Sequence, residues 1–225
     1  MKTLAFDTSS DTISAAVLEG ESISAELVMT SDRNHGETIL PLIEMVCRAA
    51  CVSMNEIDLF ALTVGPGSFT GIRVGVSTVK GFLLAGDKPV VAVSSLDALA
   101  CNSDGSSPLI CPMIDARQQQ IYTALYRWEG NAVPRRITEE CAVPPREFLE
   151  GIDGRVHFVG NGAHKYINYI EEMIGNRASV APSFHNRIRA GTVGYIGLKK
   201  FRDGDNVNPV QLVPRYLRSS YVEKR

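Results

Sequence analysis

One pattern of secondary structure occurs twice along this chain, and it limits the folds open to the chain more than any other feature. Residues 1–64 contain three strand-like segments, a helical segment and a further strand-like segment, and residues 109–159 repeat this order. Strands joined by short turns favour an antiparallel meander, and helices between strands favour mixed sheets with helices on their faces. The sequence therefore predicts an α/β protein made of two related halves.

The elements of the first half follow from apolar patterning and from turn residues. Residues 2–6 are apolar and end at the turn-forming run of residues 7–11. Apolar residues at 39, 43, 46 and 50 have the spacing of one helix face. The predicted elements are strands at 2–6, 12–18, 22–29, 59–64 and 90–93 and helices at about 39–50, 69–85 and 95–100.

Residues 102–108 are rich in Ser, Gly, Asp and Pro and form the best candidate for a linker between the halves. Beyond them the pattern restarts. The predicted elements are strands at 109–114, 121–128, 132–138 and 155–159 and helices at 145–151, about 163–174 and about 188–201.

Composition excludes several classes of protein. The chain has 225 residues, is 44% hydrophobic and carries a formal net charge of −2, so it is not predominantly disordered. It has no uncharged apolar run of roughly 18 residues, the length of a membrane span. Because the first expected strand begins at Lys2, we expect no signal peptide and a cytoplasmic location. The five cysteines include no CxxC pair, which indicates neither a disulfide framework nor a zinc knuckle.

The charge is unevenly distributed along the chain. Residues 1–64 contain 3 Lys or Arg against 10 Asp or Glu, whereas residues 186–225 contain 9 against 3. Such asymmetry indicates either one acidic and one basic partner surface or two ordinary solvated faces. The basic residues that lie close together near the C-terminus are Lys199, Lys200, Arg202, Arg215, Arg218, Lys224 and Arg225.

The most distinctive stretch is GPGSFTGIRVG at 65–75, between an expected strand and an expected helix. A glycine-rich junction of this kind directs backbone N–H groups and the positive end of a helix towards an anion. It lacks the Gly-Lys-Ser/Thr of a P-loop, and Ser68 is misplaced for a GxSxG nucleophile elbow. From the residues alone, a ligand loop and a structural turn remain equally good interpretations.

Two further turns carry polar groups at strand ends. Asp7, Thr8 and Ser9 supply a carboxylate and two hydroxyls, which suit a phosphate or a hydrated Mg²⁺ but also an ordinary Asx turn. The turn Gly160-Asn161-Gly162 has the same two interpretations.

Neither a metal hydrolase nor a serine hydrolase is indicated. The histidines at 35, 157, 164 and 185 form no HExxH motif and no HxxxH pair, so no helix presents two imidazoles on one face. No Ser/His/Asp spacing stands out. The sequence predicts no catalytic and no metal-binding residues.

Motifs along nearly the whole chain resemble those of one family, the TsaB (YeaZ) family. GPGSFTGIRVG is the most specific of these motifs. The others are LAFDTS at 4–9, HGETILPLI at 35–43, VSSLDAL at 93–99, DAR at 115–117, GNGA at 160–163 and PRYLR at 214–218.

The resemblance implies a fold of two ribonuclease-H-like halves, as in actin, sugar kinases and chaperone ATPases. It places residues 1–103 and the helix at about 188–203 in the first half, 104–187 in a smaller second half and 204–225 in a C-terminal tail. It also implies a role in forming N6-threonylcarbamoyladenosine in tRNAs that read codons beginning with adenine. In that role the paralogue TsaD carries the transferase site and its metal, TsaE is an ATPase, and TsaB is their non-catalytic partner.

The residues agree with a partner better than with an enzyme. TsaD-like chains have a paired-histidine metal motif in the first helical region, whereas this chain has His35 with Ile39 four residues later. The resemblance therefore implies no cofactor beyond weak residual nucleotide binding. The residues interpreted as remnants of a nucleotide site are Asp7, Thr8, Ser9, Gly65, Gly67, Ser68, Gly160 and Gly162.

TsaB-like proteins also form homodimers through helices of the first half. Gly71 and Gly75 are four residues apart, so one face of their helix is nearly bare, and we expect another helix to approach there. From the residues alone, the approaching partner belongs equally well to the same chain or to a second subunit. The resemblance favours a second subunit or TsaD, with tRNA contacted through the complex. The predicted interface residues are Ile39, Ile43, Val46, Gly71, Ile72, Gly75, Thr78, Val79 and Phe82.

Two alternatives to the partner role come from other classes of protein. A glycoprotease-like hydrolase would need a paired-histidine zinc site or an activated serine. A stand-alone kinase or ATPase would use Asp7 and the glycine loops, and tight Mg–ATP binding with turnover would favour it.

Overall fold

The computed structural model describes residues 1–30, 35–103, 105, 107–130, 133–209 and 211–218. The chain forms two compact units, the first made of Met1–Ala98 and Ile188–Arg215 and the second of Leu99–Arg187 and the residues from Tyr216 on. The division thus falls after Ala98 and not at the expected linker, 102–108. The expected tail is also not separate, because Leu212 is buried in the core of the first unit and Val207 pairs with Val90.

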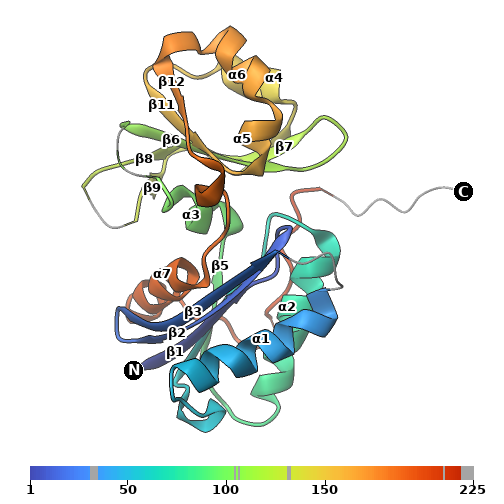
Figure 1. The fold of residues 1–225 in the computed structure, drawn as a ribbon, viewed down its shortest axis with the longest axis vertical. Coiled ribbons are helices and arrows are strands. Elements are labelled where there is room, and N and C mark those ends of the chain that lie inside the picture. Colours follow the sequence, from blue (N-terminus) through green and yellow to red (C-terminus); the bar gives the residue numbers. More distant parts are fainter. Residues whose placement is uncertain (31–34, 104, 106, 131–132, 210, 219–225) are drawn as a thin grey trace, which may run out of the picture. The chain divides into compact units, whose positions relative to one another are not determined.

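The first unit contains a mixed five-stranded sheet in the order β3-β2-β1-β4-β5 (Figure 1). The strands β1, β2 and β3 form the predicted antiparallel meander, and β4 and β5 add in parallel beside β1. Their bounds are β1 Lys2–Asp7, β2 Thr12–Glu19, β3 Ser22–Thr30, β4 Leu59–Thr63 and β5 Val90–Val93.

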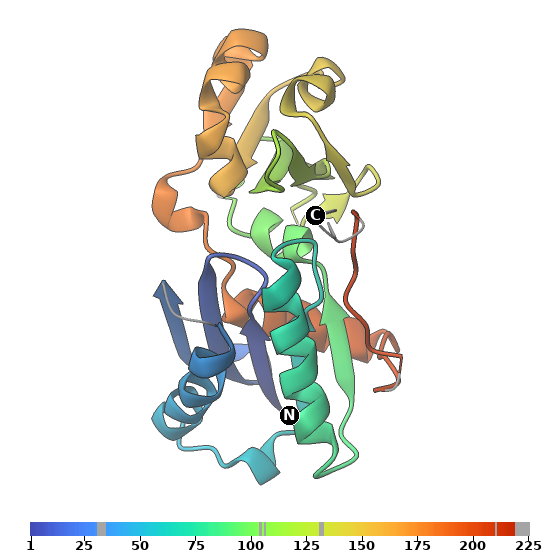
Figure 2. The same ribbon diagram turned by 90° about the vertical axis from the view of Figure 1, so that its right-hand side faces the viewer.

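Helices cover both faces of this sheet (Figure 2). On one face, α1 (His35–Ala49) and α2 (Phe69–Leu83) pack on Leu4 and Phe6. The other face is covered by α7 (Ala190–Arg202). The short α3 (Ser95–Ala100) follows β5, and the 3-10 helix η1 (Met54–Glu56) precedes β4. Successive strand residues point to opposite faces, and because helices cover both faces, the consecutive apolar residues Leu4, Ala5 and Phe6 of β1 are all buried.

Glycines allow α7 to lie close to the sheet. A Cβ at Gly197 would lie 2.5 Å from the Ala61 Cβ, and one at Gly194 would overlap the Leu18 side chain. The resemblance implied that this C-terminal helix packs back on the first half, and the contacts of α7 with β1, β2, β4 and β5 confirm it.

The second unit repeats the same strand order in its own sheet. The order β10-β7-β6-β11-β12 corresponds position by position to β3-β2-β1-β4-β5, and β8 and β9 extend the sheet beside β6. The predicted repeat is therefore present in the tertiary structure. The bounds are β6 Leu109–Asp115, β7 Ile121–Thr123, β8 Tyr126–Arg127, β9 Arg135–Arg136, β10 Cys141–Val143, β11 Val156–Val159 and β12 Ala178–Val180.

The helices of the second unit are short. Their apolar residues, with Leu149 and Ile170 fully buried, surround a core that includes Phe158. Among the described residues, no helix of either unit is long and apolar enough to cross a membrane. The bounds are α4 Pro145–Glu150, α5 Asn161–Lys165, α6 Ile167–Met173, η2 Gly175–Arg177 and η3 Ser183–His185.

The single strand predicted at 121–128 is wrong. It is two strands, β7 and β8, because they pair with opposite ends of β6 on either side of Pro112. Proline has no N–H to donate to the neighbouring strand, so the ladder is interrupted there. The Thr123 hydroxyl instead donates to the Pro112 carbonyl at 2.8 Å.

Two other predictions for the second half also need correction. The strand expected at 132–138 is only β9, with residue 132 outside the described part, and β10 takes the third position of the meander. The helix expected at 163–174 is divided into α5 and α6 at Tyr166, whose φ of −110° and ψ of 25° are not helical.

Candidate functional site

Asp7 lies at the end of β1 and is fully buried. Parallel pairing of β1 with β4 aligns Phe6 with Leu62 and so brings Thr63 beside Asp7. One carboxylate oxygen of Asp7 accepts hydrogen bonds from the Ser9 N–H at 3.0 Å, the Ser9 hydroxyl at 2.6 Å and the Thr63 hydroxyl. The first turn is therefore built around an enclosed carboxylate.

A second layer of hydroxyls supports this group. The Ser95 hydroxyl donates to the Ser9 hydroxyl at 2.8 Å, and the Ser10 hydroxyl lies 3.4 Å from the other Asp7 oxygen. The sequence interpretation missed Thr63 and Ser95. Their positions in the sequence could have identified them, because Thr63 ends a buried strand and Ser95 begins a helix. The carboxyl ends of parallel strands and the helices that follow them meet at one edge of the sheet.

Burial raises the pKa of the Asp7 carboxyl, and hydrogen bonds from Ser9, Thr63 and Ser10 oppose that rise. No cationic side chain among the described residues donates to this carboxylate. Its charge is stabilised by neutral donors alone, which is the arrangement of a structural turn and not of an ion pair.

The glycine loop packs directly on this turn. The Ser68 N–H donates to the Ser9 carbonyl at 2.7 Å, and the Thr8 hydroxyl donates to the Gly71 carbonyl at 2.7 Å. A Cβ at Gly67 would overlap the Ser9 carbonyl oxygen, and one at Gly71 would overlap that of Thr8. These glycines are required because two loops of the same chain touch.

Other parts of the first unit close the loop from its remaining sides. The Arg215 N–H donates to the Val64 carbonyl at 2.8 Å, and the Ser95 N–H donates to the Gly65 carbonyl at 2.9 Å. Gly65 has a φ of +116°, and a Cβ there would lie 2.5 Å from the Arg215 carbonyl oxygen. Ser68 is the N-cap of α2 and accepts from the Gly71 N–H at 3.2 Å.

The structure does not bring all the predicted remnant residues into one unit. Asp7, Thr8, Ser9, Gly65, Gly67 and Ser68 lie together in the first unit. Gly160 and Gly162 lie in the second unit, where both pack on the Met113 carbonyl and the intervening Asn161 accepts from the Asp115 N–H at 3.0 Å.

The predicted interface residues are largely wrong, because they face the interior of the first unit. Seven of the nine are buried; Thr78 and Phe82 are half-buried, and Phe82 stacks on Phe60. The bare face at Gly71 and Gly75 is covered by Thr8, whose hydroxyl oxygen would lie 2.6 Å from a Cβ at Gly75. A turn of the same chain, and not another helix, makes the close approach. The buried members are Ile39, Ile43, Val46, Gly71, Ile72, Gly75 and Val79.

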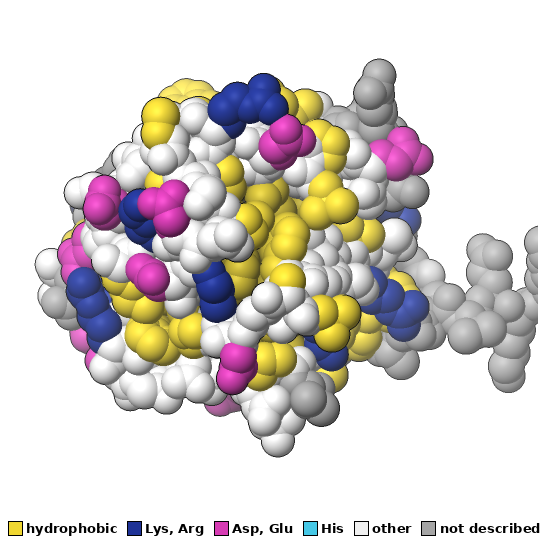
Figure 3. Space-filling model, turned by 90° about the horizontal axis from the view of Figure 1, so that it is seen from below, with side chains coloured by type: hydrophobic (Ala, Val, Ile, Leu, Met, Phe, Trp, Pro, Cys, Tyr) yellow, Lys and Arg dark blue, Asp and Glu magenta, His cyan; other side chains and the backbone are white. Residues whose placement is uncertain are grey.

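The outer side of α1 and α2 carries a different, exposed apolar surface. Between the two helices lies a groove of about 450 Å³, and the Leu40 side chain on its edge is 53% exposed. The Arg73 guanidinium lies 3.7 Å above the Phe69 ring in this groove. An end view of the first unit shows hydrophobic side chains gathered in a hollow with both basic and acidic side chains around it (Figure 3). The residues that line the groove are Gly36, Leu40, Phe69, Thr70, Arg73, Val74, Ser77 and Thr78.

Three of the four histidines are each held by a backbone or hydroxyl oxygen. His35 Nε2 lies 2.8 Å from the Ser10 carbonyl, His157 Nδ1 lies 2.8 Å from the Ser179 hydroxyl, and His164 Nε2 lies 2.8 Å from the Ala181 carbonyl. Within the described residues, no group of three His, Cys, Asp or Glu side chains is placed to hold a metal ion.

Two of the basic residues near the C-terminus have acidic neighbours. Lys200 pairs with Asp205 at 3.0 Å and Arg202 with Glu21 at 2.5 Å, which reduces the charge these side chains offer a partner. Lys224 and Arg225, which belong to the same predicted basic stretch, lie outside the described residues.

The chain is similar to the tRNA threonylcarbamoyladenosine biosynthesis protein TsaB of Bacillus subtilis, with 29% identity over 227 residues, 100% of this chain and 97% of that protein. Among solved structures, YeaZ from Pseudomonas aeruginosa superimposes with a TM-score of 0.83 at 26% identity, covering 96% of this chain and 99% of that one.

A more distant structure supports the fold alone. The ethanolamine utilization protein EutJ from Carboxydothermus hydrogenoformans has 12% identity and a TM-score of 0.56, covering 88% of this chain and 90% of that one. The predicted α/β fold with two actin-like halves, each a mixed sheet with helices, is confirmed.

The family profile described as "TsaD: tRNA N6-adenosine threonylcarbamoyltransferase" matches residues 27–224, which is most of the chain. The chain therefore belongs to this threonylcarbamoyltransferase family and, as its motifs predicted, to the TsaB (YeaZ) group of tRNA threonylcarbamoyladenosine biosynthesis proteins.

Proposed function

We propose that this chain is a non-catalytic subunit in the formation of tRNA N6-threonylcarbamoyladenosine. It works in the cytoplasm beside a TsaD-family transferase and a TsaE-family ATPase, and it uses no cofactor of its own. The observation that carries this proposal is the enclosure of Asp7. The carboxylate that best suits catalysis is fully buried under Ser9 and Thr63, and Thr8 fills the glycine loop in front of it.

The groove between α1 and α2 is the surface that we assign to the transferase. Leu40 and Phe69 lie in it, Arg73 supplies a cation, and Thr78 lies at its far end. An apolar strip with a polar rim is typical of a protein interface. A second copy of this chain would occupy the same groove when the transferase is absent.

The first test is depletion of the protein from its host. Threonylcarbamoyladenosine should disappear from tRNA although the TsaD-family protein is still present, and nucleoside analysis of bulk tRNA measures this. Re-expression of the Asp7→Ala variant from a plasmid should restore the modification if enough of it folds. A normal level of the nucleoside after depletion contradicts the proposal.

The second test concerns the groove. Leu40→Asp should weaken capture of the transferase by at least tenfold, because it places a charge in the centre of an apolar contact. Leu84→Asp is the matched control, since Leu84 is 92% exposed at the end of α2 and does not line the groove. Tight Mg–ATP binding with turnover by the purified chain, measured by titration calorimetry and phosphate release, would favour the ATPase alternative instead.

A further inference from the structure

The hairpin between β6 and β7 has a strained tip. Arg117, Gln118 and Gln119 have φ values of 59°, 48° and 58°, so three consecutive residues with side chains adopt the left-handed conformation. Each such residue is disfavoured by about 1–2 kcal/mol relative to the right-handed form. Strain of this kind persists only where the surroundings hold it in place, and it is concentrated at functional sites.

The carboxylate of Asp115 holds the tip on its inner side. One oxygen accepts from the Arg117 N–H at 3.0 Å, and the other accepts from the Lys165 ammonium at 2.7 Å. The Asp115 N–H donates in turn to the Asn161 side chain at 3.0 Å. The N–H of Gln120 closes the turn by donating to the Arg117 carbonyl at 3.0 Å.

Arg218, from the far end of the chain, holds the tip from another direction. Its guanidinium donates to the Ala116 carbonyl at 3.1 Å and to the Gln118 side-chain oxygen at 2.7 Å. These partners lie about a hundred residues earlier in the sequence, at separations of 102 and 100. This long-range contact stabilises a left-handed backbone conformation that the neighbouring residues alone would not stabilise.

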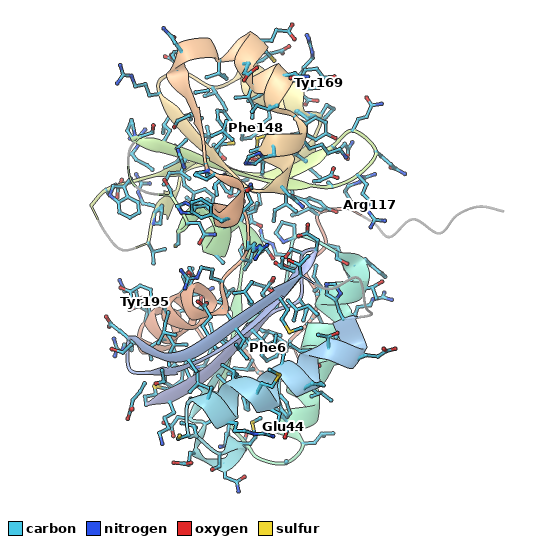
Figure 4. The ribbon with its side chains drawn as sticks, viewed as in Figure 1. Phe6, Glu44, Arg117, Phe148, Tyr169 and Tyr195 are labelled. Atoms are coloured by element: carbon cyan, nitrogen blue, oxygen red, sulfur yellow. The ribbon has the colours of Figure 1, made fainter. Side chains whose placement is uncertain are left out.

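The side chain of Arg117 is left outside this network. Arg117 is exposed, and within the described part of the chain its guanidinium makes no hydrogen bond and no ion pair. Its side chain projects from the ribbon of the second unit (Figure 4). Two cationic side chains hold the tip: Arg218 contacts it directly, and Lys165 contacts the Asp115 carboxylate. Within the described part of the chain, Asp115 is the one acidic residue that binds the tip.

We propose that residues 116–120 form a recognition tip that presents Arg117 to a phosphate group of the RNA substrate. This proposal rests on the proposed function, which supplies an RNA. A guanidinium is suited to phosphate because its planar donors match two phosphate oxygens. Among the described residues, none of the exposed large hydrophobic side chains belongs to this tip, so it fits the polar interface of a nucleic acid better than the apolar centre of a protein interface.

Arg218 is a positioning residue in this arrangement. It touches the tip and leaves Arg117 free, so its loss should loosen residues 116–120 without removing the phosphate contact itself. Hydrogen exchange of the tip amides reports this directly, and a purely structural role elsewhere in the unit would not change them.

The test measures tRNA binding by this chain together with its host's TsaD-family protein, at several salt concentrations. Arg117→Gln should weaken tRNA binding about three- to tenfold and lower the slope of log affinity against log salt by about one. Arg218→Ala should weaken binding in the same direction and raise exchange at residues 116–120.

Arg155→Gln is the matched control, because Arg155 is an exposed arginine just before β11. Parallel pairing of β11 with β6 places it beside the start of β6, whereas the tip follows the end of β6. An unchanged salt slope for Arg117→Gln overturns the proposal, as does weaker capture of the TsaD-family protein with unchanged tRNA affinity. A failure of the proposed function gives a different result from a failure of this proposal. In that case the mixture that contains the wild-type chain would form no threonylcarbamoyladenosine.

Discussion

At the scale of single residues, Asp7 is a carboxylate that the fold buries fully and surrounds with neutral hydrogen-bond donors. Burial raises its pKa in the folded protein above the ordinary value of 3.8 that we take for the unfolded chain. The folded state then binds a proton more readily than the unfolded state. Asp7 therefore contributes stability that is fully present below the ordinary pKa and is lost as the pH rises through the raised one.

Because the folded protein binds a proton at Asp7 more readily than the unfolded chain does, two variants should change stability in different ways. Asp7→Asn removes the buried charge and should make the free energy of unfolding less dependent on pH above the ordinary pKa of 3.8. Asp7→Ala leaves the Ser9 N–H and the Ser9 and Thr63 hydroxyls without their acceptor, and should cost about 1–3 kcal/mol. Urea denaturation at several pH values measures both. Stability of Asp7→Asn that falls with rising pH as steeply as in the wild type would show that another group causes the dependence.

At the scale of elements, α2 carries its glycines for two different reasons. Gly71 and Gly75 lie against Thr8, whereas a Cβ at Gly81 would meet nothing within 4 Å. Gly71→Ala should destabilise the first unit by about 1–3 kcal/mol, because backbone of the first turn must move. Gly81→Ala should stabilise it by about 0.5–1 kcal/mol, because alanine favours a helix over glycine.

Thermal unfolding of the two variants beside the wild type measures this difference. Gly75→Leu should fail to fold, because Thr8 occupies the space that its side chain would need. A Gly71→Ala variant as stable as Gly81→Ala would mean that the first turn can move away from α2 at no cost.

At the scale of the whole molecule, the first unit is completed by a segment from near the C-terminus, which comes back to it after the second unit. Residues Ile188–Arg215 supply α7, the pairing of Val207 with Val90 and the buried Leu212. A chain ending at residue 187 would leave one face of the five-stranded sheet uncovered, and its first unit should not fold. A fragment of residues 99–187 keeps most of the second unit, including its sheet and core, and should fold by itself.

Circular dichroism and limited proteolysis of the two fragments test this prediction. Leu212→Ala in the full chain is a milder control, expected to cost about 2–5 kcal/mol because it leaves a cavity in the core. A protease-resistant first unit in the shorter chain would show that α7 covers the sheet without being needed for it.

The sequence by itself determined the repeated order of strands and helices in both halves. Apolar periodicity and turn residues such as those at 7–11 act over a few neighbouring positions, and these local signals are readable without a fold. The motifs at 65–75 and elsewhere determined the family. The sequence also identified Asp7 and the glycine loop as one unusual region of the chain.

Tertiary structure alone decided what these residues do. In the sequence, Gly71 indicates a helix face without side chains. In the structure, Thr8, which lies 63 residues earlier, packs against that face. From the sequence, Ile39 and Val79 are equally compatible with an interface and with the core. Their burial in the structure shows that they belong to the core. The strand at 121–128 breaks because Pro112 lies opposite it, and Arg117 is held at a strained tip by Arg218. Each outcome depends on contacts between residues that are far apart in the sequence. The apolar periodicity of one segment does not indicate which other segment the fold packs against it.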